Sequence, residues 1–155
     1  MKLVRAKTKK DYQLLVNIDR ECFPPGDVCT DVDDWKTGEC YLVWVDGMLV
    51  GATALVLNKY FDWTTYEYEP APGCMYIAST AILPTQQGLG YGRQVKEWQI
   101  KLARKRGCFM MKISTREANI AMRSLNKSVG FKVVGIIDPA YSEPTERGVD
   151  MELIL

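Results

Sequence analysis

The segment PTQQGLGYGRQ, residues 84–94, contains three glycines within five residues. Glycine is entropically costly inside regular structure, and it is generally found where the backbone takes a positive φ or where another group approaches the main chain closely. The segment lies between an apolar run over 74–83 and a helical pattern over 90–106. Two interpretations follow: a tight turn between two packed elements, or a loop whose bare main chain receives a ligand.

The glycine spacing excludes two familiar phosphate-binding loops. Nothing in the chain matches the Walker pattern GxxxxGK followed by Ser or Thr, and the GxGxxG loop of dinucleotide-binding proteins has a wider spacing. What remains is Gln-x-x-Gly-x-Gly, formed by Gln87, Gly90 and Gly92 at the start of a predicted helix. Unpaired N–H groups and the helix dipole make such a position suitable for a pyrophosphate. From these residues alone, the turn and the anion-binding loop are equally supported.

The composition is that of one ordinary globular domain. The chain has 155 residues, 47% of them hydrophobic and 25% charged, with 20 basic and 19 acidic residues. The net charge of +1 gives no case for nucleic-acid binding. No apolar run reaches the length of a membrane span and the N-terminus lacks the apolar core of a signal peptide, so we expect a cytoplasmic protein without membrane partners.

Cysteine and histidine usage narrows the possible chemistry. The five cysteines are odd in number and form no CxxC pair, which argues against a disulfide framework and against a zinc site. Histidine is absent, so histidine-based triads and histidine-ligated metals are excluded. We expect no metal, and acid–base chemistry must use carboxylates, Tyr, Cys, Ser, Lys, main chain or water.

Hydrophobic periodicity predicts a mixed α/β chain that no linker divides, so residues 1–155 are expected to form a single domain. The predicted strands cover 2–6, 40–45, 48–57, 74–83, 109–114, 131–137 and 149–155, and the predicted helices run from a Thr8 cap to Cys22, from Thr30 through Trp35, over 90–106 and over 119–129. Asp46-Gly47 is typical of a tight hairpin turn. Residues 58–73 are aromatic and acidic, and fit a long loop or an extended hairpin tip. A Pro-containing loop is expected over 138–148.

Two segments together resemble the GCN5-related N-acetyltransferase (GNAT) superfamily. AILPTQQGLGYG (81–92) is similar to the family's strand and its Gln/Arg-x-x-Gly-x-Gly/Ala pyrophosphate loop, and NIAMRSLNKSVGF (119–131) is similar to its helix that closes on Gly-Phe. Two matches in the right order are more specific than either alone. The resemblance implies a GNAT fold over essentially the full chain: a central, mostly antiparallel sheet, splayed at a V-shaped gap and flanked by helices.

The resemblance also implies that acetyl-CoA is the cosubstrate and that its acetyl group passes directly to a primary amine of a small molecule or peptide. Main chain near Ala81, Ile82 and Leu83 would bind the pantetheine arm and the thioester oxygen. Asn119 would contact the cofactor or cap its helix, and Arg93 is either a phosphate partner or a solvated arginine. The residues expected to hold the pyrophosphate are Gln87, Gly88, Leu89, Gly90, Tyr91 and Gly92.

The candidate general acid departs from the family pattern. Many members place a Tyr four residues before the Gly of Gly-Phe, and this chain has Asn126 there. An amide cannot donate a proton and survive as a stable anion. Ser124 or Ser128 could hydrogen-bond the departing thiolate, but neither is a good acid. The thiolate can also leave unassisted because it is a weak base.

The candidate general base is Tyr76. Strand alternation would place Tyr76, Ala78, Thr80 and Ile82 on one face, and the family uses the Tyr76 position for a base in some members. A tyrosine with an ordinary pKa near 10 is a poor base at neutral pH, although it can orient a water. Packing beneath the cofactor is the alternative role. The two catalytic candidates are therefore Tyr76 and Asn126.

The resemblance places the acceptor amine between residues 22–39 and 138–148. These two segments are rich in carboxylates, which form either an acidic mouth that attracts a cationic amine or ordinary solvated loops. The carboxylates concerned are Asp27, Asp31, Asp33, Asp34, Glu39, Asp138, Glu143 and Glu146. The aromatic segment 60–68, with Trp63, would form a lid, a partner surface in a possible homodimer, or a hairpin packed on the sheet.

Three functional classes remain open at this point. The first is an active N-acetyltransferase whose partners are acetyl-CoA and an amine acceptor. The second is a non-catalytic module that binds acyl-CoA and acts as a sensor. The third is a protein-interaction domain that retains only the fold.

Overall fold

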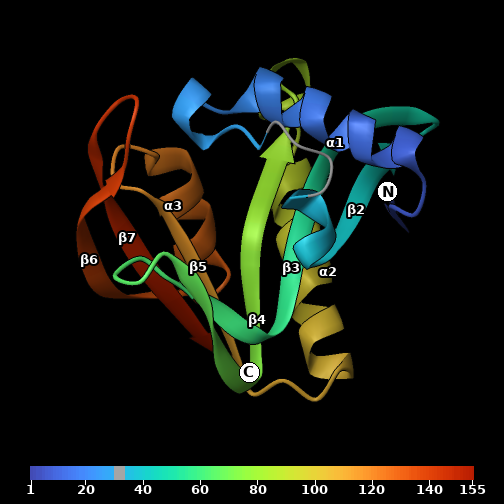
Figure 1. Cartoon of the computed structure of the whole chain (residues 1–155). Helices are drawn as coiled ribbons and strands as arrows, with labels where there is room; N and C mark the ends of the chain where they lie inside the picture. Colours follow the sequence, from blue (N-terminus) through green and yellow to red (C-terminus); the bar gives the residue numbers. More distant parts are fainter. Residues whose placement is uncertain (30–33) are drawn as a thin grey trace.

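The computed structural model describes residues 1–29 and 34–155, and Figure 1 shows a sheet with helices packed against it. The sheet has seven strands in the order β1-β2-β3-β4-β5-β7-β6. In chain order the described elements are β1 (Lys2–Arg5), α1 (Lys9–Cys22), the 3₁₀ helices η1 (Pro25–Asp27) and η2 (Asp34–Thr37), β2 (Glu39–Val45), β3 (Met48–Asp62), β4 (Glu67–Ile82), the 3₁₀ helix η3 (Pro84–Gln86), α2 (Tyr91–Lys105), β5 (Met110–Arg116), α3 (Ile120–Ser128), β6 (Lys132–Tyr141) and β7 (Glu146–Ile154).

Local sequence signals account for the first elements. The Thr8 hydroxyl accepts a hydrogen bond from the Asp11 N–H (3.2 Å), and the Asp11 carboxylate accepts one from the Thr8 N–H (2.9 Å). This reciprocal capping box fixes the start of α1, as predicted. Asp46 and Gly47 both have positive φ, 49° and 81°, and join β2 to β3 in the predicted hairpin.

Two apolar layers hold the helices to the sheet. The face of α1 that carries Leu15, Val16 and Ile18 packs on the first part of the sheet, together with Leu42 and Ala52. The other face of the sheet packs against α2. That second layer contains Leu55, Met75, Ile77, Ala103, Met111, Ile113, Phe131, Val149 and Met151.

The sheet opens between β4 and β5. These two strands run parallel and pair only at Cys74–Ile77 with Met110–Ile113, whereas their other neighbours in the sheet are antiparallel. Beyond Ile77 they diverge, and Figure 1 shows the gap between the ends of β4 and β5. The splayed, mostly antiparallel sheet confirms the fold class expected from the resemblance.

A β-bulge lies in β4 just beyond the last pair with β5. Ala54 of β3 stands opposite Ser79, and the next residue, Leu55, stands opposite Ile77. Ala78 is therefore an extra residue that has no opposite number in β3. A bulge of this kind changes which face of the sheet the following side chains occupy.

The bulge makes the predicted alternation of β4 wrong. Beyond it, the Thr80 hydroxyl accepts a hydrogen bond from the Gln99 amide of α2 (2.9 Å), and Ile82 packs with Val95 of the same helix. Before it, the Tyr76 hydroxyl bonds to β5 on the opposite face. Tyr76 and Thr80 thus do not share a face, because the extra residue at 78 shifts the phase of the strand.

The aromatic segment 58–73 is an extended hairpin. β3 and β4 continue to pair, with a shift of register between Leu57 and Lys59, until only residues 63–66 remain as the turn. The Trp63 indole N–H donates to the Ser114 hydroxyl of β5 (3.0 Å), and the Trp63 ring lies 4.8 Å from that of Tyr141 in β6. The hairpin tip therefore crosses the gap and packs on the far half of the sheet, which is one of the three placements left open by the sequence.

Two other boundaries differ from the prediction. β6 and β7 extend further than expected, so the loop predicted over 138–148 shrinks to residues 142–145. The second helix is found only as the 3₁₀ helix η2, and its predicted cap, Thr30, lies outside the described residues. In the part of the chain that the structure describes, no helix has the length and apolar character needed to cross a membrane.

Candidate active site

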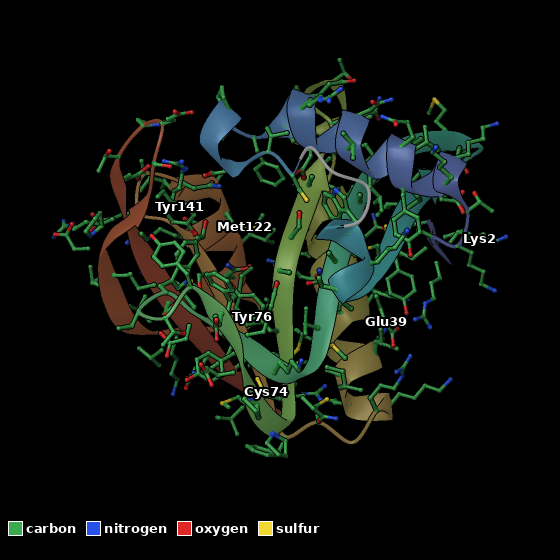
Figure 2. All side chains as sticks on the ribbon, viewed as in Figure 1. Lys2, Glu39, Cys74, Tyr76, Met122 and Tyr141 are labelled. Carbon is green, nitrogen blue, oxygen red and sulfur yellow. The ribbon has the colours of Figure 1, made fainter. Side chains whose placement is uncertain are left out.

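A cavity of about 780 Å³ lies in the gap between β4 and β5, a volume typical of small-molecule sites. Its walls come from the end of α1, the β3–β4 hairpin, β4, β5, the start of α3 and the β6–β7 hairpin. Figure 2 labels three of the side chains that line it, Tyr76, Met122 and Tyr141, on β4, α3 and β6. Segments from the whole chain therefore meet around one space.

The end of β4 presents main-chain groups to this gap. The Leu83 N–H donates to the Val50 carbonyl of β3 (2.9 Å). The Ile82 carbonyl instead accepts from the Gln87 amide (2.9 Å) and from the Cys22 thiol (3.5 Å). Main-chain groups of successive strand residues point alternately to the two sides, so the Ile82 N–H faces the gap as its carbonyl does.

The same alternation separates the three strand residues predicted to bind the cofactor. The main chain of Ala81 and Leu83 points toward β3, and that of Ile82 points toward β5. Within the described residues, the gap-facing edge of β4 has no partner strand beyond Ile77. An extended ligand could therefore pair with this edge.

The glycines that follow have two different roles. Gly88 and Gly90 have φ of +80° and +83°, and no protein atom of the described residues lies within 4 Å of the position that a Cβ would take on either. Gly92 is helical, and a Cβ there would lie 3.2 Å from Leu125 of α3. The first two glycines are required by backbone conformation, and the third by the close approach of two helices.

The glycine loop carries unpaired donors. The first turn of α2 begins after Gly90, whose carbonyl accepts from the Gln94 N–H (3.2 Å). For the main-chain N–H groups of residues 88–93, the described part of the chain supplies no hydrogen-bond acceptor. These donors lie at the positive end of a 15-residue helix, an arrangement suited to an anion.

The neighbouring polar side chains are partly engaged elsewhere. Arg93 donates to the Ser128 hydroxyl of α3 (2.9 Å) and lies 3.9 Å from Glu97. Asn119 caps α3 by accepting from the Met122 N–H (3.1 Å), as predicted, and it also lines the cavity. Whether either residue touches a cofactor stays a prediction.

Tyr76 is the predicted catalytic residue that the structure does place at the cavity. Its ring is 6% exposed, and its hydroxyl donates to the Ser114 hydroxyl across the base of the gap (3.3 Å). Ser114 in turn donates to Asp150 of β7 (2.5 Å). Burial raises the pKa of Tyr76, so its phenol is a weaker acid than usual and stays protonated at neutral pH.

Asn126 lies away from this space. Its side chain is fully buried between α3 and β7, where the amide donates to the Met151 sulfur (3.8 Å). It is not among the residues that line the cavity. A catalytic role for Asn126 stays an untested prediction, and its placement gives it no contact with the cavity.

One buried carboxylate lines the upper part of the cavity. Asp19 is 3% exposed and accepts a hydrogen bond from the Cys29 N–H (2.8 Å). Burial raises its pKa to about 6, the Cys29 hydrogen bond opposes this rise, and the charge of Asp27 adds to it. Asp19 is therefore mostly ionised at pH 7, although ionisation is costly at this position.

The predicted acidic mouth is largely neutralised by Arg116. Its guanidinium binds both oxygens of Asp27 (2.6 and 2.7 Å), reaches Glu146 (3.3 Å), and lies 4.6 Å over the Tyr141 ring. It also donates to two main-chain carbonyls of the β6–β7 loop. One side chain thus joins η1 to the β6–β7 hairpin and sets the distance between two walls of the cavity.

The remaining acidic residues do not form the expected mouth. The prediction that Glu39 belongs to the acidic mouth is wrong, because its carboxylate binds Arg106 (3.0 Å) and it does not line the cavity. Asp31 and Asp33 lie outside the described residues. Asp138 and Glu143 are exposed and do not line the cavity.

A buried polar group lies beneath β4, on the α2 side. Lys96 is fully buried, and its Nζ lies 3.5 Å from the Thr80 hydroxyl with no ion pair to a carboxylate in residues 1–29 and 34–155. Burial lowers its pKa to about 7. The ranges that the structure describes contain no group of His, Cys, Asp or Glu side chains placed to hold a metal ion.

Sequence reasoning missed four residues of this site. Asp19 had a signal, because it occupies the apolar face of α1, four residues after Leu15 and three after Val16. Ser114, Arg116 and Asp150 had none, because their partners lie at least 25 residues away in the chain.

Comparison with known proteins bears on the whole chain. The acetyltransferase (GNAT) family profile matches residues 12–131. A protein of Bacillus subtilis (strain 168) named as an uncharacterized N-acetyltransferase, YvbK, is 28% identical over 126 residues, which cover 81% of this chain and 69% of that protein.

Solved structures show the same fold. A Bacillus subtilis acetyltransferase in complex with CoA superposes with a TM-score of 0.76 at 22% identity, covering 99% of this chain and 97% of that one. An Elizabethkingia anophelis GNAT-family acetyltransferase with acetyl-CoA bound gives a TM-score of 0.74 at 17% identity, covering 99% and 97%.

Proposed function

This chain belongs to the acetyltransferase (GNAT) family, and from that premise we propose that it transfers the acetyl group of acetyl-CoA directly to a primary amine of a small molecule or peptide. One observation carries the proposal: the unpaired edge of β4 runs directly into the unpaired N–H groups at the start of α2. Pantetheine and a pyrophosphate need these two kinds of donor in this order. The CoA and acetyl-CoA in the two solved structures support the same assignment.

The bound cosubstrate would use main chain more than side chains. The pantetheine arm would pair with the β4 edge at Thr80 and Ile82, and the pyrophosphate would lie on the donors of residues 88–93. The space above Gly88 and Gly90 fits this role, because a Cβ on either residue would project where the anion must approach. Asn119 would line the same channel at the start of α3.

The chemistry needs a neutral amine and a stabilised oxyanion. The amine attacks the thioester carbon, a C–N bond forms, the C–S bond breaks, and the carbonyl oxygen carries negative charge in between. The Ile82 N–H faces the gap and would donate to that oxygen, as preorganised main-chain donors do in acyl transfer. The second proton of the amine passes to the thiolate, which yields CoA without a dedicated acid near Asn126.

The acceptor is expected to carry positive charge. Three described carboxylates line the cavity. Arg116 forms ion pairs with Asp27 and Glu146, whereas Asp19 has no ion pair with a cationic side chain among the described residues. A buried carboxylate in a cavity that aromatic side chains also line favours an ammonium ion over an anion. We expect the KM of a cationic acceptor to rise with salt and to rise in Asp19→Asn, and a salt-independent KM would contradict this.

Two measurements on the same protein test the proposed function. Calorimetry with acetyl-CoA should show binding, and a thiol-release assay across monoamines, diamines and peptide N-termini should find at least one turnover substrate. Absence of heat at millimolar acetyl-CoA would refute the proposal. Binding without turnover for the whole panel would instead favour the non-catalytic acyl-CoA sensor, for which the burial of Asn126 away from the cavity is the supporting observation.

A further inference from the structure

Three side chains at the base of the gap form a hydrogen-bonded chain with one direction. The Tyr76 hydroxyl donates to Ser114 (3.3 Å), and the Ser114 hydroxyl donates to the Asp150 carboxylate (2.5 Å). The Trp63 indole donates to the same Ser114 oxygen (3.0 Å). Ser114 thus uses its one proton toward Asp150 and both lone pairs toward Tyr76 and Trp63, so no other orientation of its hydroxyl satisfies all three contacts.

The chain connects two sides of the hairpin. Tyr76 and Ser114 line the large cavity, and both also line a second, small recess whose wall includes Asp150 and Lys112. Tyr76 is almost fully buried, whereas Asp150 is only partly buried. The chain therefore starts at the cavity and ends at a carboxylate on the other side of the β3–β4 hairpin.

A chain of this kind fits the chemical need of the site. An ammonium cannot attack a thioester until it loses a proton. Tyr76 cannot act as the base in the form of a phenolate, because burial raises its pKa and keeps the phenol protonated. A hydroxyl can nevertheless accept one proton while it donates its own, so that it never carries a net charge. The proton needs a terminal acceptor, and Asp150 supplies one.

We propose that Tyr76, Ser114 and Asp150 relay the first proton of the acceptor ammonium out of the cavity, an inference that rests on the proposed function. The ammonium proton moves to the Tyr76 oxygen, the Tyr76 proton to Ser114, and the Ser114 proton to Asp150. The products are a neutral amine, two neutral hydroxyls and a protonated Asp150, which then releases the proton to water. Tyr76 contacts the amine, and the other two residues act through Tyr76.

The surroundings of Asp150 allow it to accept and release the proton. Burial raises its pKa, whereas the Ser114 hydrogen bond and the charge of Lys112 lower it. Glu152 on β7 and Asp62 on β3 add negative charge that favours the protonated form. Lys112 is itself paired with Glu152 (2.9 Å), so it does not lock Asp150 in an ion pair.

Matched variants test the relay in the full chain. Asp150→Asn keeps an oxygen for Ser114 to donate to but cannot accept the proton, and Asp138→Asn makes the same change at an exposed position of the neighbouring strand β6 that does not line the cavity. General acid–base contributions are typically about 10²–10⁴-fold, so kcat at pH 7 should fall by about 10²-fold in Asp150→Asn and in Ser114→Ala. Asp138→Asn should stay within about threefold, and the KM for acetyl-CoA should be unchanged in all three variants.

The pH profile separates a relay from a merely structural role. Without the relay only amine that is already neutral reacts, so kcat/KM of Asp150→Asn should rise with pH up to the pKa of the free amine and approach the wild-type value there. A loss that is equal at all pH values would overturn the relay. If the wild type is active but Asp150→Asn matches Asp138→Asn, the relay alone is refuted; if the wild type releases no thiol from any amine, the proposed function is refuted with it.

A readout without turnover checks the connection itself. The side-chain indole N–H signal of Trp63 in a ¹H–¹⁵N spectrum should shift as Asp150 titrates, because Ser114 links the two groups. The shift should persist in Asp138→Asn and vanish in Asp150→Asn and Ser114→Ala. A Trp63 signal that titrates identically in Asp150→Asn and the wild type would show that the chain is not coupled, and would overturn the proposal.

Discussion

Replacing the buried Asp19 by Asn should stabilise the protein at neutral pH. The side chain is 3% exposed, and within the described residues its ionised form gains one main-chain hydrogen bond, from Cys29, in return for losing its hydration. Asn keeps an oxygen for that hydrogen bond and carries no charge. The variant therefore removes the cost of burying the charge and preserves the local contact.

The size of the effect follows from the pKa of Asp19. Folding raises this pKa from 3.8 to about 6, a difference of about two units. Each unit corresponds to 1.36 kcal/mol, so ionised Asp19 lowers the free energy of unfolding by about 3 kcal/mol at pH 7.5. That is a large part of the stability of a domain of this size, which is typically about 5–15 kcal/mol.

The direction of the pKa shift of Asp19 determines the pH range in which Asp19→Asn changes the stability. A carboxyl whose pKa is raised on folding contributes stability that is fully present below pH 3.8 and is lost as pH rises through about 6. The variant and the wild type should thus be nearly equal in stability at pH 3.5. Their difference should grow between about pH 4 and pH 7 and then stay constant.

Urea unfolding followed by tryptophan fluorescence measures this difference, at closely spaced pH values from 3.5 to 8. Asp11→Asn on the same helix is the control with the opposite sign, because hydrogen bonds from the Lys7 and Thr8 N–H groups lower the pKa of Asp11. That variant should lose stability at neutral pH and approach the wild type in acid. A flat difference for Asp19→Asn, or a variant less stable than the wild type at pH 7.5, would refute the reasoning.

Three further predictions concern other parts of the molecule. Gly90→Ala should raise the Kd of acetyl-CoA by about tenfold, or 1.4 kcal/mol, in calorimetry. Its control is Gly107→Ala, at a residue with φ of +72° and equal free space: both variants should lower the free energy of unfolding by about 1–2 kcal/mol, but Gly107→Ala should leave the Kd unchanged. Equal Kd values for the two variants would contradict the assignment of the glycine loop to the cofactor. Arg116→Ala should lower the free energy of unfolding by about 1.5–3 kcal/mol, because it removes charge-assisted hydrogen bonds to two partly buried carboxylates. The exposed Arg147→Ala should cost less than about 1 kcal/mol, and similar costs for the two variants would show that the Arg116 network is not stabilising. Lys96→Met should stabilise the protein at pH 7 by several kcal/mol and progressively less as pH rises toward 10.5, since the pKa of this lysine is lowered to about 7, and a gain that does not shrink with pH would contradict this.

Local signals predicted most of the fold. The Thr8–Asp11 capping box, the Asp46-Gly47 turn and the two later helices depend on residues close together in the chain, and each was found near its predicted position. The splay between β4 and β5 is a tertiary feature, and it was expected only because two segments resemble a known family. Propensity and spacing could not have supplied it.

The bulge at Ala78 shows where pattern reasoning fails. Nothing in the sequence around it marks an extra residue, because a bulge is defined by the partner strand and β3 approaches β4 from another part of the chain. Alternation therefore placed Tyr76 and Thr80 on the same face. The two hydroxyls in fact point to opposite faces: that of Tyr76 bonds to Ser114 of β5, and that of Thr80 bonds to Lys96 and Gln99 of α2.

The candidate site was predictable to a similar degree. The glycine positions and Asn119 follow from local conformation: Gly88 and Gly90 have positive φ at the start of α2, and Asn119 lines the cavity. The partners of Tyr76 could not be predicted, because Ser114 and Asp150 come from β5 and β7 and are brought together only by strand register. Glu39 was wrongly included because its place in the segment 22–39 says nothing about the direction of its side chain, which binds Arg106.

The brevity of the β4–β5 seam has a mechanical consequence. The two halves of the sheet are joined there by four residue pairs, about 13 Å of strand, and diverge beyond them. A small rotation of one half of the sheet about this short seam produces a larger displacement of the strand ends at the open side of the gap. The indole of Trp63, on the β3–β4 hairpin, bonds to Ser114 of β5 just beyond this seam and so restrains the rotation. Loss of this hydrogen bond would let the two halves of the sheet move apart and would widen the cavity between them.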